Sequence, residues 1–265
     1  MYQVNYHRAS SVAEAAKLAK IGDAKFLSGG MTLIPTMKAR LAAPTDLVDL
    51  AHIAELKGIR VSGKTVTIGA AVTHYEVAND EKLKKVVPAV ARLASLIGDP
   101  AVRHKGTIGG SISNNDPAAD YPAALLALGA TIATNKREIA ADKFFKGLFE
   151  TALKDGEIVT SITFTLPAKA AYEKFRNPAS RYAMTGVFVA KGKEGVRVAV
   201  TGAGDDGVFR SREIEAALTK KFDASALDGL ELSPANLMSD MHASAEYRAH
   251  LVVVMARRAV AAANA

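Results

Sequence analysis

The spacing of apolar and polar residues alternates between a helical period and a strand period in the first fifty residues. An Ala- and Leu-rich run follows Ser11 and stops at Gly22, and Glu14 stands three residues after Ser11, which is the pattern of a capping box. Residues 24–27 and 46–50 show the short apolar alternation of strands. The chain is therefore expected to begin with short helices and strands in turn.

Glycine and proline divide the later segments. Gly63 and Lys64 separate two alternating runs within residues 59–70, which predicts a hairpin with a two-residue turn. A second hairpin is expected to turn at residues 192–195. Helical patterns lie beyond Pro35, from Pro88 to Gly98, and at 122–128, 211–221 and 243–263. Together these elements predict an α+β protein without internal repeats.

A change of organisation is expected near Pro167, where long alternating strands begin. We expect an N-terminal domain at residues 1–166, made of two α+β subdomains with a break near residue 56. A smaller domain of a sheet and helices is expected at residues 167–265. A chain of 265 residues is long enough to form both cores.

The amino-acid composition excludes several classes of protein and of cofactor site. The chain is 49% hydrophobic and 23% charged, as expected of a soluble globular protein, and it contains no cysteine. It can therefore form no disulfide and bind no iron–sulfur cluster through thiolates, so any such cluster must lie on a partner. The N-terminus lacks the apolar stretch of a signal peptide, and LVVVMA at 251–256 runs directly into Arg257. We expect a cytoplasmic protein with no membrane span and a buried C-terminal helix.

The formal net charge of +7 raises the question of nucleic-acid binding. Lys and Arg are spread along the chain, aromatic residues make up only 6%, and the densest basic cluster, residues 82–85, is typical of a solvated helix face. We expect no nucleic-acid partner, although a basic surface can attract an acidic subunit or a dianionic ligand. No metal-ligating or paired carboxylate motif is recognisable, so no metal site is predicted.

Two glycine segments carry the candidate binding chemistry, FLSGGMTLIP at 26–35 and GTIGGSISNNDPAAD at 106–120. Glycine permits positive φ and has no Cβ, so successive N–H groups can turn inward and bind an anion. Two such loops predict a diphosphate ligand. Taken alone, each Gly-Gly pair is more simply a tight turn, because neither segment has the spacing of a P-loop or of a Rossmann fingerprint. Neutral hydroxyl donors are also present: Thr32, Thr107, Ser111 and Ser113.

The second glycine segment is expected to precede a helix. Asp120 is placed to cap the helix at 122–128, which Gly129 can end. This puts the segment beside a helix N-terminus, where anions are favoured.

Four segments, in order, resemble the FAD-binding medium subunits of molybdenum hydroxylases, the xanthine dehydrogenase and carbon monoxide dehydrogenase family. FLSGGMTLIPTMKARL is similar to the family loop Ala-Gly-Gly-x-Ser-Leu-x-Pro-x-x-Lys-x-Arg, and TIGGSISNNDPAAD is similar to its second flavin loop. The resemblance continues in YEKFRNPASRYAMTGV at 172–187 and in SDMHASAEYRAHLVVVMARRA at 239–259. It therefore covers essentially the whole chain.

The resemblance implies a vanillyl-alcohol-oxidase (PCMH)-type FAD-binding domain followed by a smaller C-terminal domain. The first loop would wrap the FAD diphosphate, and the second would bind it from the other side. FAD would be non-covalent, because neither loop contains His or Cys. The cofactor-binding residues implied are Ser28, Gly29, Gly30, Met31, Thr32, Thr107, Ile108, Gly109, Gly110, Ser111, Asp120, Val159 and Lys174.

Several of these positions also have a purely structural interpretation. Lys174 matches a family lysine near the isoalloxazine, where a cation stabilises the negative charge of reduced flavin, but it is also a plausible exposed strand lysine. Tyr182 matches a tyrosine near the ring, and it is the second flavin-tuning candidate; no residue is assigned as certainly catalytic. Asp120 is equally a helix cap, Val159 is equally a buried strand residue, and His74 is interpreted as a surface or core histidine.

Two positions depart from the family pattern. Met31 stands where many relatives have a polar residue, and Ser111 replaces the usual Asn. The first change removes a side-chain contact and the second shortens one hydrogen-bonding arm, and neither is expected to abolish FAD binding.

The resemblance also implies a division of labour among subunits. A large molybdopterin subunit would oxidise the substrate, and a small subunit with 2Fe-2S clusters would pass electrons to the FAD of this chain. The electrons would leave to NAD, a quinone or oxygen. The expected assembly is a dimer of heterotrimers, and the substrate and acceptor are not encoded in any motif of this chain.

Two other functions stay open. One is an FAD-binding assembly module without turnover, against which the presence of Lys174 and Asp120 argues. The other is a stand-alone flavin-dependent reductase similar to the UDP-N-acetylenolpyruvylglucosamine reductases, against which the segment at 239–259 argues.

Overall fold

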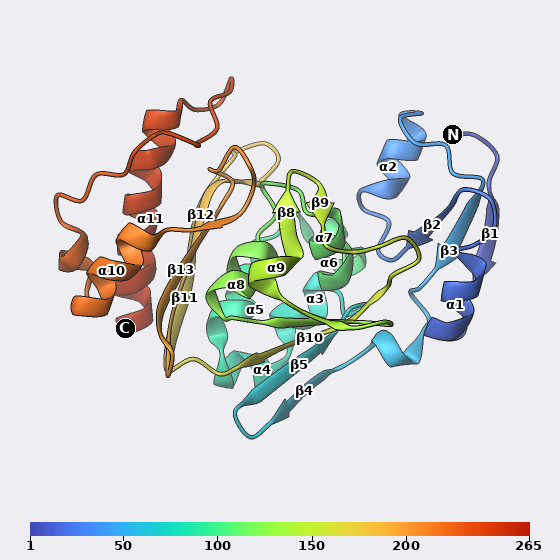
Figure 1. The fold of residues 1–265 in the computed structure, drawn as a ribbon, viewed down its shortest axis with the longest axis horizontal. Helices are drawn as coiled ribbons and strands as arrows, with labels where there is room; N and C mark the ends of the chain where they lie inside the picture. Colours follow the sequence, from blue (N-terminus) through green and yellow to red (C-terminus); the bar gives the residue numbers. More distant parts are fainter.

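The computed structural model describes residues 1–265, and three main sheets follow one another across the molecule in chain order (Figure 1). The N-terminal sheet lies at one end, the largest sheet lies in the middle under a group of helices, and the C-terminal sheet stands between that group and the last helix. The mixture of helices with separate sheets confirms the α+β prediction.

The N-terminal sheet is parallel, and β3 is its central strand. Parallel neighbours need crossover connections, which two short helices provide. β3 is buried along its whole length, since it has a strand on each side and α1 packs against it. The elements are β1 (Asn5–Arg8), α1 (Val12–Leu18), β2 (Ala24–Leu27), α2 (Leu33–Lys38) and β3 (Asp46–Asp49).

Both N-terminal helices begin slightly differently from the prediction. The Ser11 hydroxyl accepts a hydrogen bond from Glu14 N at 3.1 Å, but the Glu14 carboxylate binds the N–H and hydroxyl of Ser10 instead of returning to Ser11. The reciprocal half of the capping box is thus displaced by one residue. Helix α2 begins at Leu33, before Pro35, because N–H groups in a first turn have no intrahelical acceptor and a proline there loses nothing.

The middle sheet is antiparallel and has the order β4–β5–β10–β6–β7. The expected hairpin is present as the first two strands, with Gly63 at φ 57 in the turn. The strands are β4 (Ile59–Ser62), β5 (Thr65–Gly69), β6 (Thr131–Thr134), β7 (Glu138–Ala140) and β10 (Val159–Thr165), with the short helix η1 (Ala54–Leu56) before them. A small hairpin, β8 (Phe145–Gly147) with β9 (Glu150–Thr151), follows α9 (Ala141–Phe144).

Six helices lie between β5 and β6, and all of them except α6 contribute buried residues to the largest core, which they form with this sheet (Figure 1). Pro88 begins one of them, as predicted, and Gly98 follows that helix at φ 48. The helices are α3 (His74–Asn79), α4 (Glu81–Val86), α5 (Pro88–Ser95), α6 (Pro100–Lys105), α7 (Ile108–Asn114) and α8 (Tyr121–Ala127).

The C-terminal sheet separates two hydrophobic cores. Along β12, Val187 and Val189 pack toward the C-terminal helices, whereas Phe188 and Ala190 belong to the core of the middle domain. Successive strand residues point to opposite faces, so both faces of this sheet are apolar and buried. Its elements are β11 (Lys169–Arg176), β12 (Ala183–Gly192), β13 (Gly195–Thr201), β14 (Phe209–Arg210), α10 (Arg212–Lys220), η2 (Ala224–Leu227) and α11 (Ala245–Asn264).

The predicted C-terminal elements agree with this arrangement. The hairpin turns between Gly192 and Gly195, and α10 and α11 occupy nearly the predicted ranges. Helix α11 buries one side against the sheet, and its exposed residues include Arg257 and Arg258. None of the helices has the length and apolar content that crossing a membrane requires.

Candidate functional site

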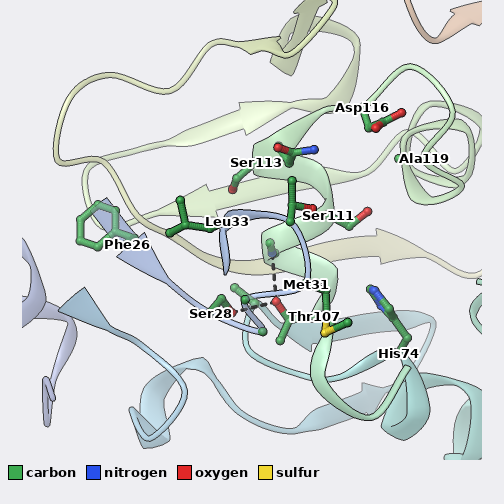
Figure 2. Close-up of a pocket in the computed structure, with 18 of the residues that line it drawn as sticks. Phe26, Ser28, Met31, Leu33, His74, Thr107, Ser111, Ser113, Asp116 and Ala119 are labelled. Carbon is green, nitrogen blue, oxygen red and sulfur yellow. Dashed lines mark hydrogen bonds between the residues drawn. The ribbon is translucent and has the colours of Figure 1, made fainter. Parts of the chain in front are cut away.

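A cavity of about 620 Å³ lies between the N-terminal sheet and the helices of the middle domain. Figure 2 shows part of its wall, from the loop after β2, the start of α7 and the segment at 116–120. The loop before β10 and the turn between β11 and β12 complete it. Elements from all three parts of the chain therefore meet around one space, whose volume is that of a small-molecule or cofactor site.

The first glycine segment presents unpaired backbone donors to this cavity. Residues 28–32 all line it, and none of their N–H groups donates a hydrogen bond to a protein acceptor. Gly30 has φ 71, and a Cβ on Gly29 would lie 2.0 Å from the carbonyl oxygen of Lys105. Glycine is thus needed where the loop reverses and where it touches the second segment. Unpaired N–H groups in such a place require a ligand or water as acceptor.

The second glycine segment does not form an open loop, which corrects the prediction of a second row of free N–H groups. Thr107 is the N-cap of α7, and the glycines lie in the first helical turn. Their N–H groups are already used, because the turn packs against the end of β5 and is capped by its own threonine. From residue 108 to residue 111 the acceptors are Val72 O, Ala70 O, Thr107 Oγ1 and Thr107 O.

What this segment offers the cavity is mainly hydroxyl groups. Ser111 and Ser113 line the wall, and Thr107 Oγ1 lies 2.8 Å from Ser28 Oγ (Figure 2). The two segments are therefore in direct contact. The first segment presents backbone N–H donors to the cavity, and the second presents hydroxyl groups. Such neutral donors match the oxygens of a phosphate group.

Asp120 lies at another part of the wall and is bound by two side chains of β11. It accepts hydrogen bonds from Tyr172 OH at 2.5 Å and from Lys174 Nζ at 2.9 Å. The Asp120 and Lys174 side chains are only 5% and 2% exposed. Burial raises the pKa of Asp120, and the Lys174 charge opposes that rise. The ion pair keeps a lysine charge beside the cavity in a water-poor position.

The predicted capping role of Asp120 is wrong. Helix α8 begins at Tyr121, and Asp120 itself has helical dihedral angles and makes no side-chain cap hydrogen bond. Its carboxylate turns instead toward β11, where a cation and a phenol satisfy it. A buried carboxylate gains more from that pair than from one more N–H group.

The cavity wall contains all the predicted cofactor-binding residues except two. Ile108 is buried in the core of the middle domain, and Lys174 lies behind Asp120. Val159, at the start of β10, and Tyr182, which is 49% exposed in the turn between β11 and β12, both line the cavity. The wall thus brings together residues from Ser28 to Tyr182, and their contact with FAD stays a prediction.

His74 was not selected as a site residue, yet it lies on the cavity wall (Figure 2). The residue is 5% exposed, and its Nδ1 atom has no hydrogen-bond partner in the protein. Burial lowers the pKa of His74 to about 4, and the charge of Arg103 acts in the same direction. The imidazole is therefore neutral near pH 7. No local signal in the sequence distinguished it from an ordinary core histidine.

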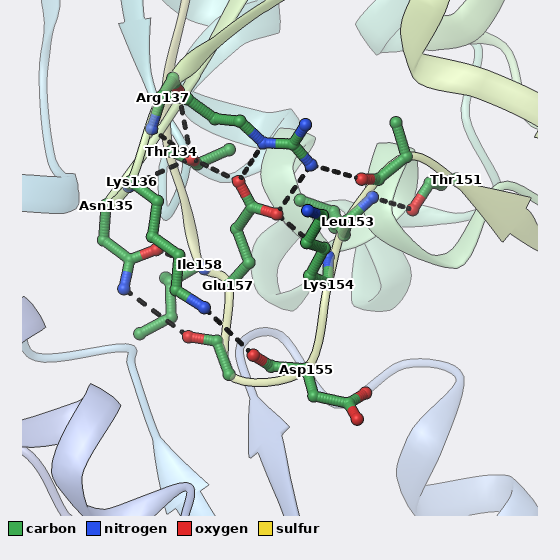
Figure 3. Close-up of polar contacts among 12 residues, drawn as sticks. Thr134, Asn135, Lys136, Arg137, Thr151, Leu153, Lys154, Asp155, Glu157 and Ile158 are labelled. Carbon is green, nitrogen blue, oxygen red and sulfur yellow. Dashed lines mark hydrogen bonds and ion pairs between the residues drawn. The ribbon is translucent and has the colours of Figure 1, made fainter.

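Glu157 was also missed, and it anchors the loop that leads into β10. Its side chain has no exposed surface and accepts hydrogen bonds from Arg137 Nε at 2.9 Å, from Thr134 Oγ1 at 2.8 Å and from Lys154 N at 2.9 Å (Figure 3). Arg137 is the main reason that the pKa of Glu157 is lowered to about 2. The network fixes the backbone that carries Val159 into the cavity wall.

Asp116 adds a second carboxylate to the wall. It forms no ion pair, and its side chain accepts a hydrogen bond only from Ala118 N, at 2.9 Å. Burial raises the pKa of Asp116, and it also raises the pKa of Tyr182, to which the charge of Asp116 contributes. The segment at 106–120 contains both Asp116 and Asp120, but only Asp120 was selected as a cofactor-binding residue.

Comparison with known families assigns both halves of the chain. Residues 2–168 match the family described as the FAD binding domain in molybdopterin dehydrogenase, and residues 170–263 match the CO dehydrogenase flavoprotein C-terminal domain. The match to an FAD-binding family confirms the predicted cofactor, FAD.

Individual relatives extend over nearly the whole chain. It is 37% identical to the carbon monoxide dehydrogenase medium chain of Afipia carboxidovorans, over 98% of this chain and 96% of the relative. It is 35% identical to the glyceraldehyde dehydrogenase medium chain of Sulfolobus acidocaldarius, over 97% of each. Both relatives are subunits of dehydrogenases, so this chain is an oxidoreductase subunit.

The fold agrees with a solved structure. A chain of the carbon monoxide dehydrogenase from Hydrogenophaga pseudoflava, in a form that lacks the Mo-pyranopterin moiety of its molybdenum cofactor, superposes with a TM-score of 0.89 at 35% identity, covering 99% of this chain and 97% of that one. The expected α+β fold and domain order, an FAD-binding domain followed by a smaller C-terminal domain, are confirmed. The chain belongs to the FAD-binding medium subunits of the molybdenum hydroxylases, the family of carbon monoxide dehydrogenase and xanthine dehydrogenase.

Proposed function

We propose that this chain is the electron-output subunit of a molybdenum hydroxylase. It holds FAD non-covalently in the cavity, receives electrons from 2Fe-2S clusters of a small partner subunit, and delivers them to NAD, a quinone or oxygen. A large molybdopterin subunit carries out the substrate oxidation, and the complex is a dimer of heterotrimers. Clusters on a partner agree with a chain that contains no cysteine.

One observation carries this proposal: the N–H groups of residues 28–32 have no protein acceptor and line the same cavity as the hydroxyls of Ser111 and Ser113. Oriented N–H groups on a glycine loop bind anions without a charged side chain. A diphosphate placed there would satisfy donors that otherwise have only water. Residues 28–32 would then hold the diphosphate, and α7 would close the other side.

The residues around Asp120 fit the redox-active end of the cofactor. FAD supplies the redox chemistry when bound, and protein groups set its potential. Asp120 holds Lys174 Nζ at 2.9 Å, so the lysine charge cannot move away into solvent. From behind Asp120, this cation offsets the charge of the carboxylate at the wall and so lessens its repulsion of the negatively charged reduced form of a flavin. Tyr182, half-exposed on the facing turn, would cover the ring and limit access to it.

We also propose that residues 1–166 act as the FAD-binding domain and residues 167–265 as the C-terminal flavoprotein domain, with a subdomain break near residue 56. In support, six of the eight residues of a separate small core lie at or before residue 56, and another core forms between the last sheet and α11.

A titration with FAD tests the binding part of the proposal. Gly29→Ala places a Cβ against the Lys105 carbonyl and should displace the 28–32 loop, so flavin fluorescence should report weaker FAD binding. Gly192→Ala is the matched control, because nothing lies within 4 Å of a Cβ at that position. Equal FAD affinity in both variants would show that the loop does not hold the cofactor.

The electron-transfer part needs the assembled complex. The complex should be purified with its co-eluting chains, reduced with its substrate, and followed at the flavin absorption bands with NAD and a quinone offered in turn. Bleaching that an acceptor reverses supports an electron-output subunit. FAD that stays oxidised in an otherwise reduced complex favours the assembly module, and full activity of the isolated chain favours the stand-alone reductase.

A further inference from the structure

Arg248 is a buried cation that the cofactor site described above does not use. It lies near the beginning of α11, within the segment at 239–259, and its side chain is 3% exposed. A guanidinium so far from water depends on acceptors from the protein, and of its three nitrogens only Nε lacks one. Its partners therefore indicate what it holds together.

Three acceptors surround the two terminal nitrogens of Arg248. Nη1 donates to the carbonyl oxygens of Met184 and Gly202, the latter at 2.7 Å, and Nη2 donates to Asp240 Oδ2 at 2.8 Å. Met184 lies in β12, Gly202 directly follows β13, and Asp240 lies in the loop before α11. One planar group thus joins two strand ends to a helix and its preceding loop, which a single point charge cannot do.

The same strand ends hold the cofactor wall from the other side. Gly202 N donates to the carbonyl oxygen of Pro117 at 2.8 Å, and Thr201 Oγ1 donates to that of Ala119 at 2.6 Å. Pro117 and Ala119 lie between the two carboxylates of the wall. Asp120 follows directly, so a hydrogen-bonded path runs from Arg248 to the residue that binds Lys174.

A second, shorter connection leads to Tyr182. Met184, whose carbonyl oxygen accepts from Arg248, lies two residues beyond Tyr182 on the same strand end. The intervening residue, Ala183, is in close contact with Gly202, since a Cβ on Gly202 would lie 2.2 Å from the Ala183 carbonyl oxygen. Movement at Gly202 would therefore be transmitted to both sides of the cavity wall.

We propose that Arg248 is a positioning residue for the flavin site: from the C-terminal domain it fixes the wall that carries Asp120 and the turn that carries Tyr182. This inference rests on the proposed function, because it assumes that FAD occupies the cavity. It gives the buried arginine of the segment at 239–259 a role toward the cofactor, beyond holding α11 on the sheet.

The test compares two substitutions on the same helix in the full chain. Arg248→Lys keeps the charge but cannot reach both carbonyls and Asp240 at once. Arg257→Lys is the matched control, since Arg257 pairs with Asp228 at 2.6 Å and both side chains are about half exposed. For Arg248→Lys we expect FAD to bind about tenfold more weakly, which corresponds to the loss of one charge-assisted hydrogen bond. We also expect the flavin midpoint potential to become more negative, because the Lys174 charge loses its fixed position. Arg257→Lys should leave both unchanged.

The outcomes distinguish a failure of the proposed FAD site from a failure of the proposed role of Arg248. If the unaltered chain binds no FAD, the proposed function fails before Arg248 is tested. If Arg248→Lys lowers the melting temperature but leaves the FAD affinity and the potential of the folded protein unchanged, Arg248 is only structural and the proposal is overturned. Should Arg248→Lys not fold, Asp240→Asn replaces it, because that change spares both carbonyl contacts. A weaker shift of the potential in the same direction is expected there, and no shift would overturn the proposal.

Discussion

Ser28 Oγ lies 2.8 Å from Thr107 Oγ1, although 79 residues separate them in the chain. The Thr107 oxygen also accepts a hydrogen bond from Gly110 N at 3.0 Å, so one threonine both caps α7 and contacts the loop after β2. This contact sets how closely the donors at 28–32 approach the second glycine segment. The shape of the cavity therefore depends on two hydroxyl groups from different subdomains.

Substitution of Thr107 tests this link. Thr107→Ala removes the cap of α7, which should lower the free energy of unfolding by about 1 kcal/mol, and it should also weaken FAD binding because the two segments are no longer joined. Thr107→Ser keeps the hydroxyl and should retain most of the stability and most of the FAD affinity. Denaturant unfolding and FAD titration measure the two effects separately. Unaltered FAD affinity in Thr107→Ala would show that the contact does not shape the site.

Removing only one partner of the buried Lys174–Asp120 ion pair should strongly lower the free energy of unfolding. Lys174→Met leaves a buried carboxylate without its cation, so we expect a loss of about 3 kcal/mol in the free energy of unfolding. Adding Asp120→Asn should recover part of it. Lys169→Met, in the same strand and bonded through an exposed contact to Asn264, serves as the control and should have almost no effect. Equal losses at positions 169 and 174 would contradict the assignment.

Acid should destabilise the protein through Glu157. Its pKa is lowered from 4.5 to about 2 in the folded chain, mainly by Arg137. A carboxylate with a lowered folded pKa stabilises the fold above its unfolded pKa, and that contribution disappears as the pH falls toward the folded value. The free energy of unfolding should therefore decrease between about pH 4.5 and pH 2. In Arg137→Met this slope should flatten, and stability near pH 7 should fall by about 2 kcal/mol; an unchanged slope would argue against the pair.

His74 should remain neutral well below its usual titration range. Its pKa is lowered from 6.5 to about 4, first by burial and second by the Arg103 charge. The unfolded chain binds this proton at a higher pH than the folded chain, so stability is lost as the pH falls from 6.5 toward 4. An NMR titration of the imidazole carbon-bound protons, assigned with a His74→Asn variant, should show no protonation of His74 at pH 5.5. A midpoint near 6.5 would mean that the ring is accessible to water.

The elements whose signals are local could be predicted from sequence. The strand at 24–27, the hairpin turn at Gly63 and the helix that starts at Pro88 depend on residues only a few positions apart, and all three are present. The motif order was sufficient to identify the FAD-binding family, because four segments in the right order rarely occur together by chance. The glycines were correctly singled out, since Gly29 and Gly30 do stand where a side chain would clash or strain the loop.

Only the tertiary structure decided what several of these residues do. Asp120 has every local feature of a cap, yet β11, some fifty residues later, supplies Tyr172 and Lys174 as stronger partners. Two N–H groups of the second glycine segment, those of residues 108 and 109, are taken up by residues 72 and 70, which no local pattern reveals. His74, Asp116 and Glu157 reach the cavity through long-range packing. Local backbone preferences extend over one or two turns of chain, whereas burial and the pairing of polar groups depend on contacts that exist only once the three sheets have come together.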